Sequence, residues 1–150
     1  MRRRFARWVL GVLSVVTVGV QLIRPVRTNP PVDAARTLHA RISVPSEVKA
    51  VFDRACRDCH SHETRWPWYS NVAPVSWLVI DHVNHGRSHL NFSDWAQYTP
   101  ADAEKLIEKS CKLARDGSMP MPSYLWMHHD ARLDTRDIEL ICDWASGPAQ

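Results

Sequence analysis

The 150-residue chain lacks any segment in which polar and apolar residues alternate as they do in a half-buried β-strand. It also lacks an internal repeat, which excludes a repeat architecture. What remains is helical periodicity, in short stretches separated by long connections. The sequence therefore predicts an all-α fold whose folded part is a bundle of four or five short helices.

Acidic residues are absent from the first 27 positions, although the whole chain holds 16 of them. The same positions contain six of the 19 basic residues, all of them arginine. The rest of the chain carries 13 basic against 16 acidic residues, so the formal net charge of +3 belongs to the N-terminal segment. A nucleic-acid-binding surface needs clustered Lys and Arg on the folded part, and we therefore expect no nucleic-acid partner.

One long uncharged run lies near the N-terminus, at residues 8–23. As a helix, this run would measure roughly 24 Å, and Arg7 and Arg24 at its ends could extend their charges to the edges of a ~30 Å hydrocarbon layer. A cleaved secretory signal is the alternative, but no small-x-small cleavage site follows the run. We predict a transmembrane anchor, with the arginine-rich N-terminus in the cytoplasm.

The chain divides into four predicted segments. Residues 1–7 form a cytoplasmic basic segment and residues 8–23 the anchor. Residues 24–44 form a linker, with three prolines and no clear apolar period, and residues 45–150 form the folded domain. The anchor and the cleaved signal both send this domain across the membrane.

Helical periodicity begins directly after the linker. Ser46 is the predicted N-cap of a first helix, whose apolar face is formed by residues at helical spacing, namely Val48, Val51, Phe52 and Ala55. A second helix is expected over residues 74–86, ending near Gly86. The first helix leads into the segment that carries the cysteines.

Two further helices have clear start and stop signals. Thr99 caps the third, which ends at Gly117. Asp134 and Asp137 form a capping box at the start of the fourth, which ends at Gly147. The signals thus locate four of the four or five helices that are expected in the folded domain.

Cysteine is scarce, and two of the four cysteines stand in the segment CRDCH at residues 56–60. C-x-x-C-H is the attachment signature of c-type haem. Two thiols three residues apart can reach two vinyl groups on one porphyrin edge and become thioethers, while the adjacent histidine binds the iron as the proximal ligand. The segment therefore predicts one covalently bound haem c, held by Cys56, Cys59 and His60.

Two other uses of the cysteine pair stay open. A zinc site usually takes a second Cys or His pair at short spacing, whereas Cys111 and Cys142 each stand alone. With His62 as a fourth ligand, a zinc site would crowd four ligands into seven residues. A redox-active dithiol needs the pair at the start of a helix that follows a strand, and no strand is expected.

Further along, the segment GSMPMPSY at residues 117–124 offers a sixth ligand for the iron. Thioether sulfur is a soft donor for ferrous iron, and proline stiffens the loop that carries it. Met119 directly follows the Gly-Ser turn and is the predicted distal ligand, with Met121 as the alternative. Met/His ligation raises the reduction potential relative to ligation by two nitrogens.

With its amphipathic helix before CRDCH, GSMP well downstream and a short C-terminal helix, the chain resembles a class I cytochrome c. More narrowly, it is similar to a family of small bacterial haem-binding domains with an N-terminal membrane anchor. The likeness covers residues 45–146. It implies that Cys56 and Cys59 form the thioethers, that His60 is the proximal ligand and that Met119 is the distal one.

Aromatic and basic residues are candidates for the surroundings of the haem. We expect Trp66, Trp68 and Trp77 to pack on the porphyrin. Arg65 and Arg87 are candidates for its carboxylates, by charge alone. Four histidines could reach the iron or line a proton path, with a surface or capping role as the alternative: His82, His85, His128 and His129.

The other two cysteines, Cys111 and Cys142, fall on the inner faces of the third and fourth predicted helices. In an oxidising compartment they would form a disulfide that clamps these helices together. Two small buried apolar residues are the alternative. We predict the disulfide.

Together these features predict a membrane-anchored monohaem c-type cytochrome that transfers single electrons, in a bacterial inner membrane with its haem domain in the periplasm. Its partners would be redox proteins of the respiratory or periplasmic chain, with a basic surface that complements the acidic domain. The alternative is a peroxidase-like haem enzyme, or a gas or redox sensor, with an open or displaceable sixth ligand. Only the polar residues Tyr124, His128 and His129 support that alternative, so an electron carrier is favoured over an enzyme.

Overall fold

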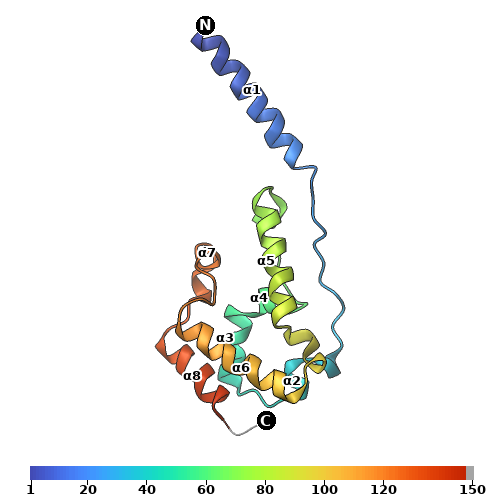
Figure 1. Cartoon of the computed structure of the whole chain (residues 1–150), viewed down its shortest axis with the longest axis vertical. Helices are drawn as coiled ribbons and strands as arrows, with labels where there is room; N and C mark the ends of the chain where they lie inside the picture. Colours follow the sequence, from blue (N-terminus) through green and yellow to red (C-terminus); the bar gives the residue numbers. More distant parts are fainter. Residues whose placement is uncertain (148–150) are drawn as a thin grey trace.

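The computed structural model describes residues 1–147, and every regular element in this range is a helix (Figure 1). The last three residues of the predicted domain 45–150 lie outside the described range. The eight α-helices are α1 (Arg2–Val20), α2 (Leu38–Arg41), α3 (Ser46–Ala55), α4 (Arg57–His60), α5 (Val75–His89), α6 (Pro100–Arg115), α7 (Pro122–Leu125) and α8 (Thr135–Ala145). Four short 3₁₀ helices are interspersed: η1 (Ala34–Arg36), η2 (Trp68–Asn71), η3 (Phe92–Gln97) and η4 (His129–Ala131). The prediction of an all-α fold is confirmed.

The prediction of a transmembrane helix over residues 8–23 is wrong. Within residues 1–147, no helix combines the length and the apolar composition that a membrane crossing needs. Helix α1 begins at Arg2 and therefore includes the N-terminal arginines, and it ends at Val20, before the uncharged run does. Its uncharged part, residues 8–20, is roughly 20 Å long, against a hydrocarbon layer of ~30 Å. The predicted single-pass location in an inner membrane, with a periplasmic domain, is therefore also corrected.

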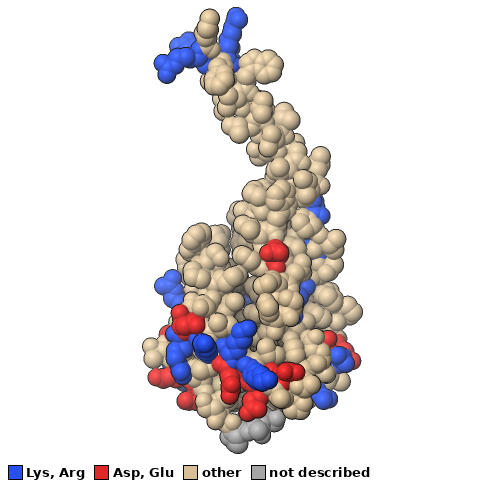
Figure 2. Space-filling view, viewed as in Figure 1, with Lys and Arg blue, Asp and Glu red and all other residues tan. Residues whose placement is uncertain are grey.

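Helix α1 projects away from the rest of the molecule, with basic side chains at its free end (Figures 1 and 2). After α1, the chain descends beside α5 and is hydrogen-bonded to the folded part. The Gln21 side chain exchanges two hydrogen bonds with the backbone of Ala73, at 2.9 and 3.1 Å. The Trp77 indole N–H donates to the carbonyl of Ile23 at 2.8 Å. This segment is thus fastened to the surface near α5, while the boundaries of the four segments stay a prediction.

The hydrophobic core lies where α3 and α8 pack against each other. The apolar face predicted for α3 is buried as a whole. Phe52 stacks on Phe92 of η3, with ring centroids 5.1 Å apart, and meets Trp144 of α8 edge-on at 5.6 Å. Ser46 is the first residue of α3 rather than its cap, because the N-cap position is taken by Pro45. This core supports the end of α3 from which the cysteine segment emerges.

The caps predicted at the starts of α6 and α8 are present in the structure. The Thr99 hydroxyl accepts the Asp102 backbone N–H at the start of α6, and Gly117 behind that helix has a positive φ of 73°. Asp134 and Asp137 form the capping box of α8. A disulfide joins Cys111 of α6 to Cys142 of α8, which confirms the predicted clamp.

Replacing both clamp cysteines by alanine (Cys111→Ala with Cys142→Ala) is expected to lower the free energy of unfolding by about 3–4 kcal/mol, because the disulfide closes a loop with a sequence separation of 31. Denaturant titration under non-reducing conditions measures the change. Wild-type protein with reductant should approach the stability of the double variant. Equal denaturation midpoints for oxidised wild type and double variant would contradict a stabilising clamp.

Candidate functional site

A cavity of about 360 Å³ is lined by residues of α5 on one side and of α6 and the loop that follows it on the other. Figure 1 shows where these helices lie. Its volume is that of a site for a small molecule or cofactor, and most of its lining is apolar. Five residues predicted from the sequence line this one cavity: Cys56, Cys59, His60, Met119 and Met121. The tertiary structure therefore brings together the two motifs that the sequence separates.

The cysteines and the histidine are presented by a single helical turn. Helix α3 ends at Ala55, and Cys56 is its C-cap as well as the N-cap of α4. The backbone N–H of His60 donates to the carbonyl of Cys56 at 3.0 Å, and that of Cys59 donates to the same carbonyl at 3.2 Å. This tight turn places all three side chains on the cavity wall.

Backbone carbonyls of α5 and its C-cap orient the His60 ring. Its Nδ1 lies 3.0 Å from the carbonyl oxygen of Gly86 and 3.0 Å from that of Leu90. Carbonyls only accept, so Nδ1 carries the hydrogen and Nε2 keeps its lone pair. Burial lowers the pKa of His60, although the two carbonyl bonds oppose the shift. The ring is thus a neutral imidazole whose Nε2 has a free lone pair, which is the form that binds a metal.

Gly86 permits the close approach of α5 to this turn. A Cβ at this position would lie 2.6 Å from the carbonyl oxygen of Cys59, a separation that real Cβ atoms essentially never show. The sequence predicted that the helix ends near Gly86, but α5 continues to His89. The glycine serves the contact between α4 and α5 and does not end the helix.

The two cavity cysteines are free thiols with strongly raised pKa values. Burial, reinforced by Cys59, raises the pKa of Cys56 to about 12. Burial, reinforced by Asp58, raises the pKa of Cys59 to about 11. Redox-active dithiols need a lowered thiol pKa, so the raised pKa values of Cys56 and Cys59 argue against that use.

A zinc knuckle finds no support either. Among residues 1–147, no group of three or more His, Cys, Asp or Glu side chains is placed to hold a metal ion. His62 hydrogen-bonds to Asn91 at 2.9 Å and is not among the cavity-lining residues of the described chain. Cys111 and Cys142 are joined to each other. The cavity is better suited to a large apolar cofactor than to a bare ion.

The two methionines come from the methionine loop, which we define as residues 118–121, between α6 and α7. The backbone N–H of Met119 donates to the carbonyl of Leu113 at 3.0 Å, which fastens the start of the loop to α6. Met121 is the N-cap residue of α7. Both side chains line the cavity. The choice of Met119 over Met121 as distal ligand stays a prediction.

Part of the cavity lining is polar. Lys109 and Ser110 of α6 and three histidines of α5, His82, His85 and His89, contribute to its lining. The Nε2 atoms of His85 and His89 lie 3.0 Å apart. By its charge, the Lys109 ammonium group is a candidate partner for the carboxylates of a haem. The sequence analysis considered His82 and His85 but not Lys109 and His89. These two residues reach the cavity lining only because α5 and α6 face each other across it.

Other candidates lie elsewhere in the described structure. The three tryptophans are not among the cavity-lining residues: Trp66 lies against Arg27 and Arg87, Trp68 is 71% exposed, and Trp77 bonds to the N-terminal segment. Phe52, Phe92 and Tyr124 are the aromatic residues that do line the cavity. Residue type alone favoured the tryptophans, whereas Phe52 carried the stronger signal because it lies on the apolar face of α3.

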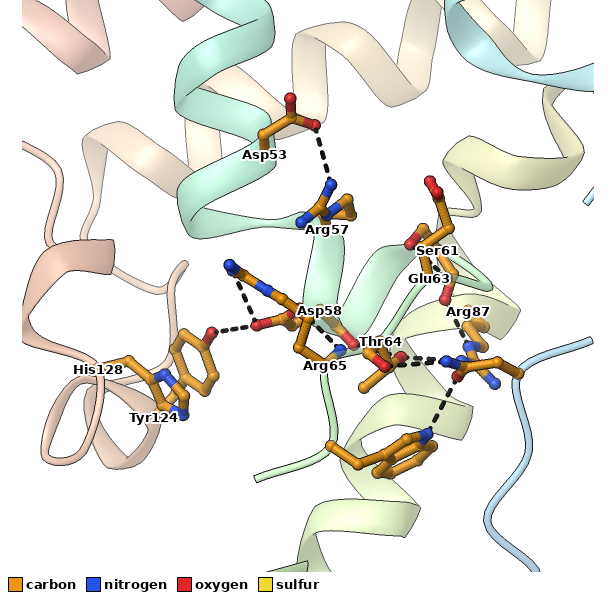
Figure 3. A network of polar contacts seen from close by, with 12 residues as sticks. Asp53, Arg57, Asp58, Ser61, Glu63, Thr64, Arg65, Arg87, Tyr124 and His128 are labelled. Atoms are coloured by element: carbon orange, nitrogen blue, oxygen red, sulfur yellow. Dashed lines mark hydrogen bonds and ion pairs between the residues drawn. The ribbon is translucent and has the colours of Figure 1, made fainter. Parts of the chain in front are cut away.

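The two arginines considered for the haem carboxylates have other partners. Arg87 donates to the backbone carbonyls of Ser61 and Thr28 and to the side chains of Asn29 and Thr64, at 2.7–2.9 Å (Figure 3). Arg87 therefore joins α5 to the N-terminal segment and to the residues that follow α4 in the sequence, Ser61 and Thr64. Within the described range, neither Arg87 nor Arg65 lines the cavity, and the same holds for His128 and His129.

The residue that precedes Cys59 in the sequence, Asp58, has a buried carboxylate, whose contacts are drawn in Figure 3. Asp58 is 8% exposed and accepts hydrogen bonds from the backbone N–H and the guanidinium of Arg65, at 3.1 and 3.2 Å. The Tyr124 hydroxyl donates to the other oxygen of this carboxylate at 3.1 Å. Bonding to Asp58 raises the pKa of Arg65. The sequence gives no sign of this contact, because 66 positions separate Tyr124 from Asp58.

The fold and the site define an all-α domain whose apolar cavity collects two thiols, one imidazole and two thioethers, groups of the kinds that can hold a haem. The comparison with protein families agrees with this class. Residues 15–147 match the family described as Haem-binding domain, and the chain belongs to this family. Comparisons with curated proteins and with solved structures give no match. Haem binding is therefore the function that the family establishes.

Proposed function

We propose that this protein is a monohaem c-type cytochrome that transfers single electrons. The observation that carries the proposal is the single turn at Cys56, Cys59 and His60, which presents two neutral thiols and one imidazole to the cavity that the methionine loop also lines. Covalent attachment requires two thiols three residues apart with the histidine directly behind them. A methionine on the same cavity could bind the iron in addition to the histidine, and Met/His ligation would suit electron transfer.

The residues have separate tasks in this proposal. Each thiol would add across a vinyl group, its sulfur forming a C–S bond and its hydrogen passing to the neighbouring carbon, so that no net oxidation occurs. His60 would bind the iron through Nε2, with Nδ1–H held by the carbonyls of Gly86 and Leu90. The bound iron supplies the one-electron chemistry, while the apolar lining excludes water.

The alternative function, a peroxidase-like enzyme or a gas or redox sensor, depends on polar groups that can act on a small ligand. Tyr124 lines the cavity, but its hydroxyl already donates to Asp58 at 3.1 Å. A low-spin ferric spectrum with the weak far-red band of methionine–iron ligation supports electron transfer. A high-spin spectrum with ready binding of carbon monoxide would favour the alternative.

The proposed partners are redox proteins. The chain beyond residue 27 carries more acidic than basic residues, so a basic docking surface would complement it. Such encounters are weak and fast, and they need only a small interface.

Production of the protein in cells that attach c-type haem tests the proposal. We expect the denatured wild-type protein to keep the added mass of one haem and its Soret absorption, because thioethers survive unfolding. Cys56→Ser with Cys59→Ser should lose both signals after denaturation, since serine forms no thioether.

The matched control is Cys111→Ala with Cys142→Ala, which removes the two cysteines that form the disulfide outside the cavity lining. This control should retain the haem mass in full. Wild-type protein without added mass, or equal haem retention in the Cys56/Cys59 variant, would contradict covalent attachment.

A further inference from the structure

Helix α7 is held with little help from apolar packing. It consists of the four residues Pro122–Leu125, and none of them is buried. Trp126 and Met127, which follow it, are 75% and 56% exposed. Because burial of apolar surface is the main force that holds helices in place, this short helix needs another tie to stay against the cavity.

The Tyr124 hydroxyl supplies a polar tie. It donates to the Asp58 carboxylate of α4, and so links the helix behind the methionine loop to the turn that carries the two cysteines (Figure 3). Burial raises the pKa of Tyr124, so the phenol keeps its hydrogen and remains a donor. Arg65 in turn holds the Asp58 carboxylate through two hydrogen bonds, so the acceptor of the Tyr124 hydroxyl is fixed in place.

The Tyr124–Asp58 hydrogen bond is connected to the methionine loop through a backbone hydrogen bond. The N–H of Tyr124 donates to the carbonyl of Met121 at 2.9 Å, so a displacement of Tyr124 carries Met121 with it. The other end of the loop is fastened independently, by the bond from Met119 to Leu113. The loop thus has one attachment on α6 and one that runs through Tyr124 to α4.

The ring of Tyr124 is also held by a stacking contact. It stacks on His128, with centroids 4.0 Å apart and planes 9° from parallel. The Tyr69 hydroxyl of η2 is hydrogen-bonded to Nε2 of His128 at 2.7 Å. A phenylalanine at position 124 would keep this stack and lose only the bond to Asp58.

We propose that the Tyr124–Asp58 hydrogen bond is a latch that closes the methionine loop over the cavity, and that both are positioning residues for the distal methionine. The proposal rests on the function proposed above. Without this hydrogen bond, α7 is no longer held against α4 and the methionine loop moves farther from the cavity. A methionine sulfur then spends less time at the iron.

Tyr124→Phe tests the latch with two independent readouts. In protein without haem, backbone hydrogen exchange of residues 119–125 should become about tenfold faster, because a bond to a charged acceptor is lost. In protein with covalently attached haem, capture of added imidazole by the ferric iron should also become about tenfold faster, and the far-red methionine band should weaken. The exchange measurement needs no haem, so it separates a failed latch from a failed haem assignment.

The matched control is Tyr98→Phe, which removes a hydroxyl that accepts the Asn91 N–H at 2.9 Å and does not line the cavity. It should leave both readouts of the latch unchanged. In an Asp58→Ala background, adding Tyr124→Phe should change either readout less than twofold, because the hydroxyl has lost its partner.

Three results would overturn the latch. The first is unchanged exchange of residues 119–125 in Tyr124→Phe. The second is faster exchange with an unchanged rate of imidazole capture and an unchanged far-red band, since the bond would then close the loop without positioning the ligand. The third is a full tenfold effect of Tyr124→Phe in the Asp58→Ala background, because the hydroxyl would then act without the carboxylate.

Discussion

Gly86→Ala is expected to separate α5 from the cysteine turn and to disrupt the proximal side of the site. The new methyl group would lie 2.6 Å from the Cys59 carbonyl oxygen, and the neighbour is backbone, which cannot turn aside. Helix α5 must therefore shift, and the carbonyls of Gly86 and Leu90 shift with it, so that His60 loses the bonds that orient its ring. We expect the free energy of unfolding to fall by about 3 kcal/mol, at the upper end for an overpacked contact.

Denaturant titration measures the loss of stability, and the ferric absorption spectrum reports the loss of ordered histidine ligation. Asn84→Ala is the matched control, because Asn84 is exposed on the same helix and alanine suits a helix better than asparagine does. A Gly86→Ala protein as stable as Asn84→Ala, with the wild-type spectrum, would show that the close approach of α5 to α4 does not support the site.

Met119→Ala should remove the distal ligand of the iron. The backbone of Met119 is fixed to α6, so no neighbouring residue can take over its position without rearranging the loop. The far-red band should disappear, the iron should become partly high-spin, and the reduction potential should fall by on the order of 0.1 V, within the ~0.8 V range that axial ligands span. Ferric spectra and a redox titration measure these changes.

Met121→Ala is the natural counterpart, since it removes the same side chain two positions along the same cavity lining. It should keep the far-red band and change the potential much less. The reverse outcome, with the band lost only in Met121→Ala, would assign the distal position to Met121. Retention of the band in both variants would contradict methionine ligation altogether.

The parts of the fold that were predicted correctly follow from contacts within a few residues along the chain. Thr99 caps α6 because its hydroxyl accepts an N–H three residues on, and Asp134 starts α8 for the same reason. The buried face of α3 follows from helical spacing. The C-x-x-C-H segment is equally local, since one turn determines how its side chains are grouped.

The errors arose where distant packing or residue type was decisive. The uncharged run at residues 8–23 predicted a longer apolar helix than α1 provides, because the run does not mark where the helix begins or ends. Residue type favours the tryptophans, because aromatic rings pack on porphyrin, but the fold places Trp66 and Trp77 against the N-terminal segment. Gly86 was taken for a helix end, although its role depends on a backbone atom 27 positions earlier.

By itself, the sequence determined that this protein is all-α and where its capped helices begin, because spacing and capping act over a few residues. It also selected five side chains as candidates to offer sulfur or nitrogen to a haem. Only the tertiary structure decided that these five line one cavity, which carbonyls orient His60 and that Tyr124 reaches Asp58. The physical reason is that such contacts join segments tens of residues apart. Their geometry depends on how α4, α5 and α7 pack together, and no local pattern encodes that.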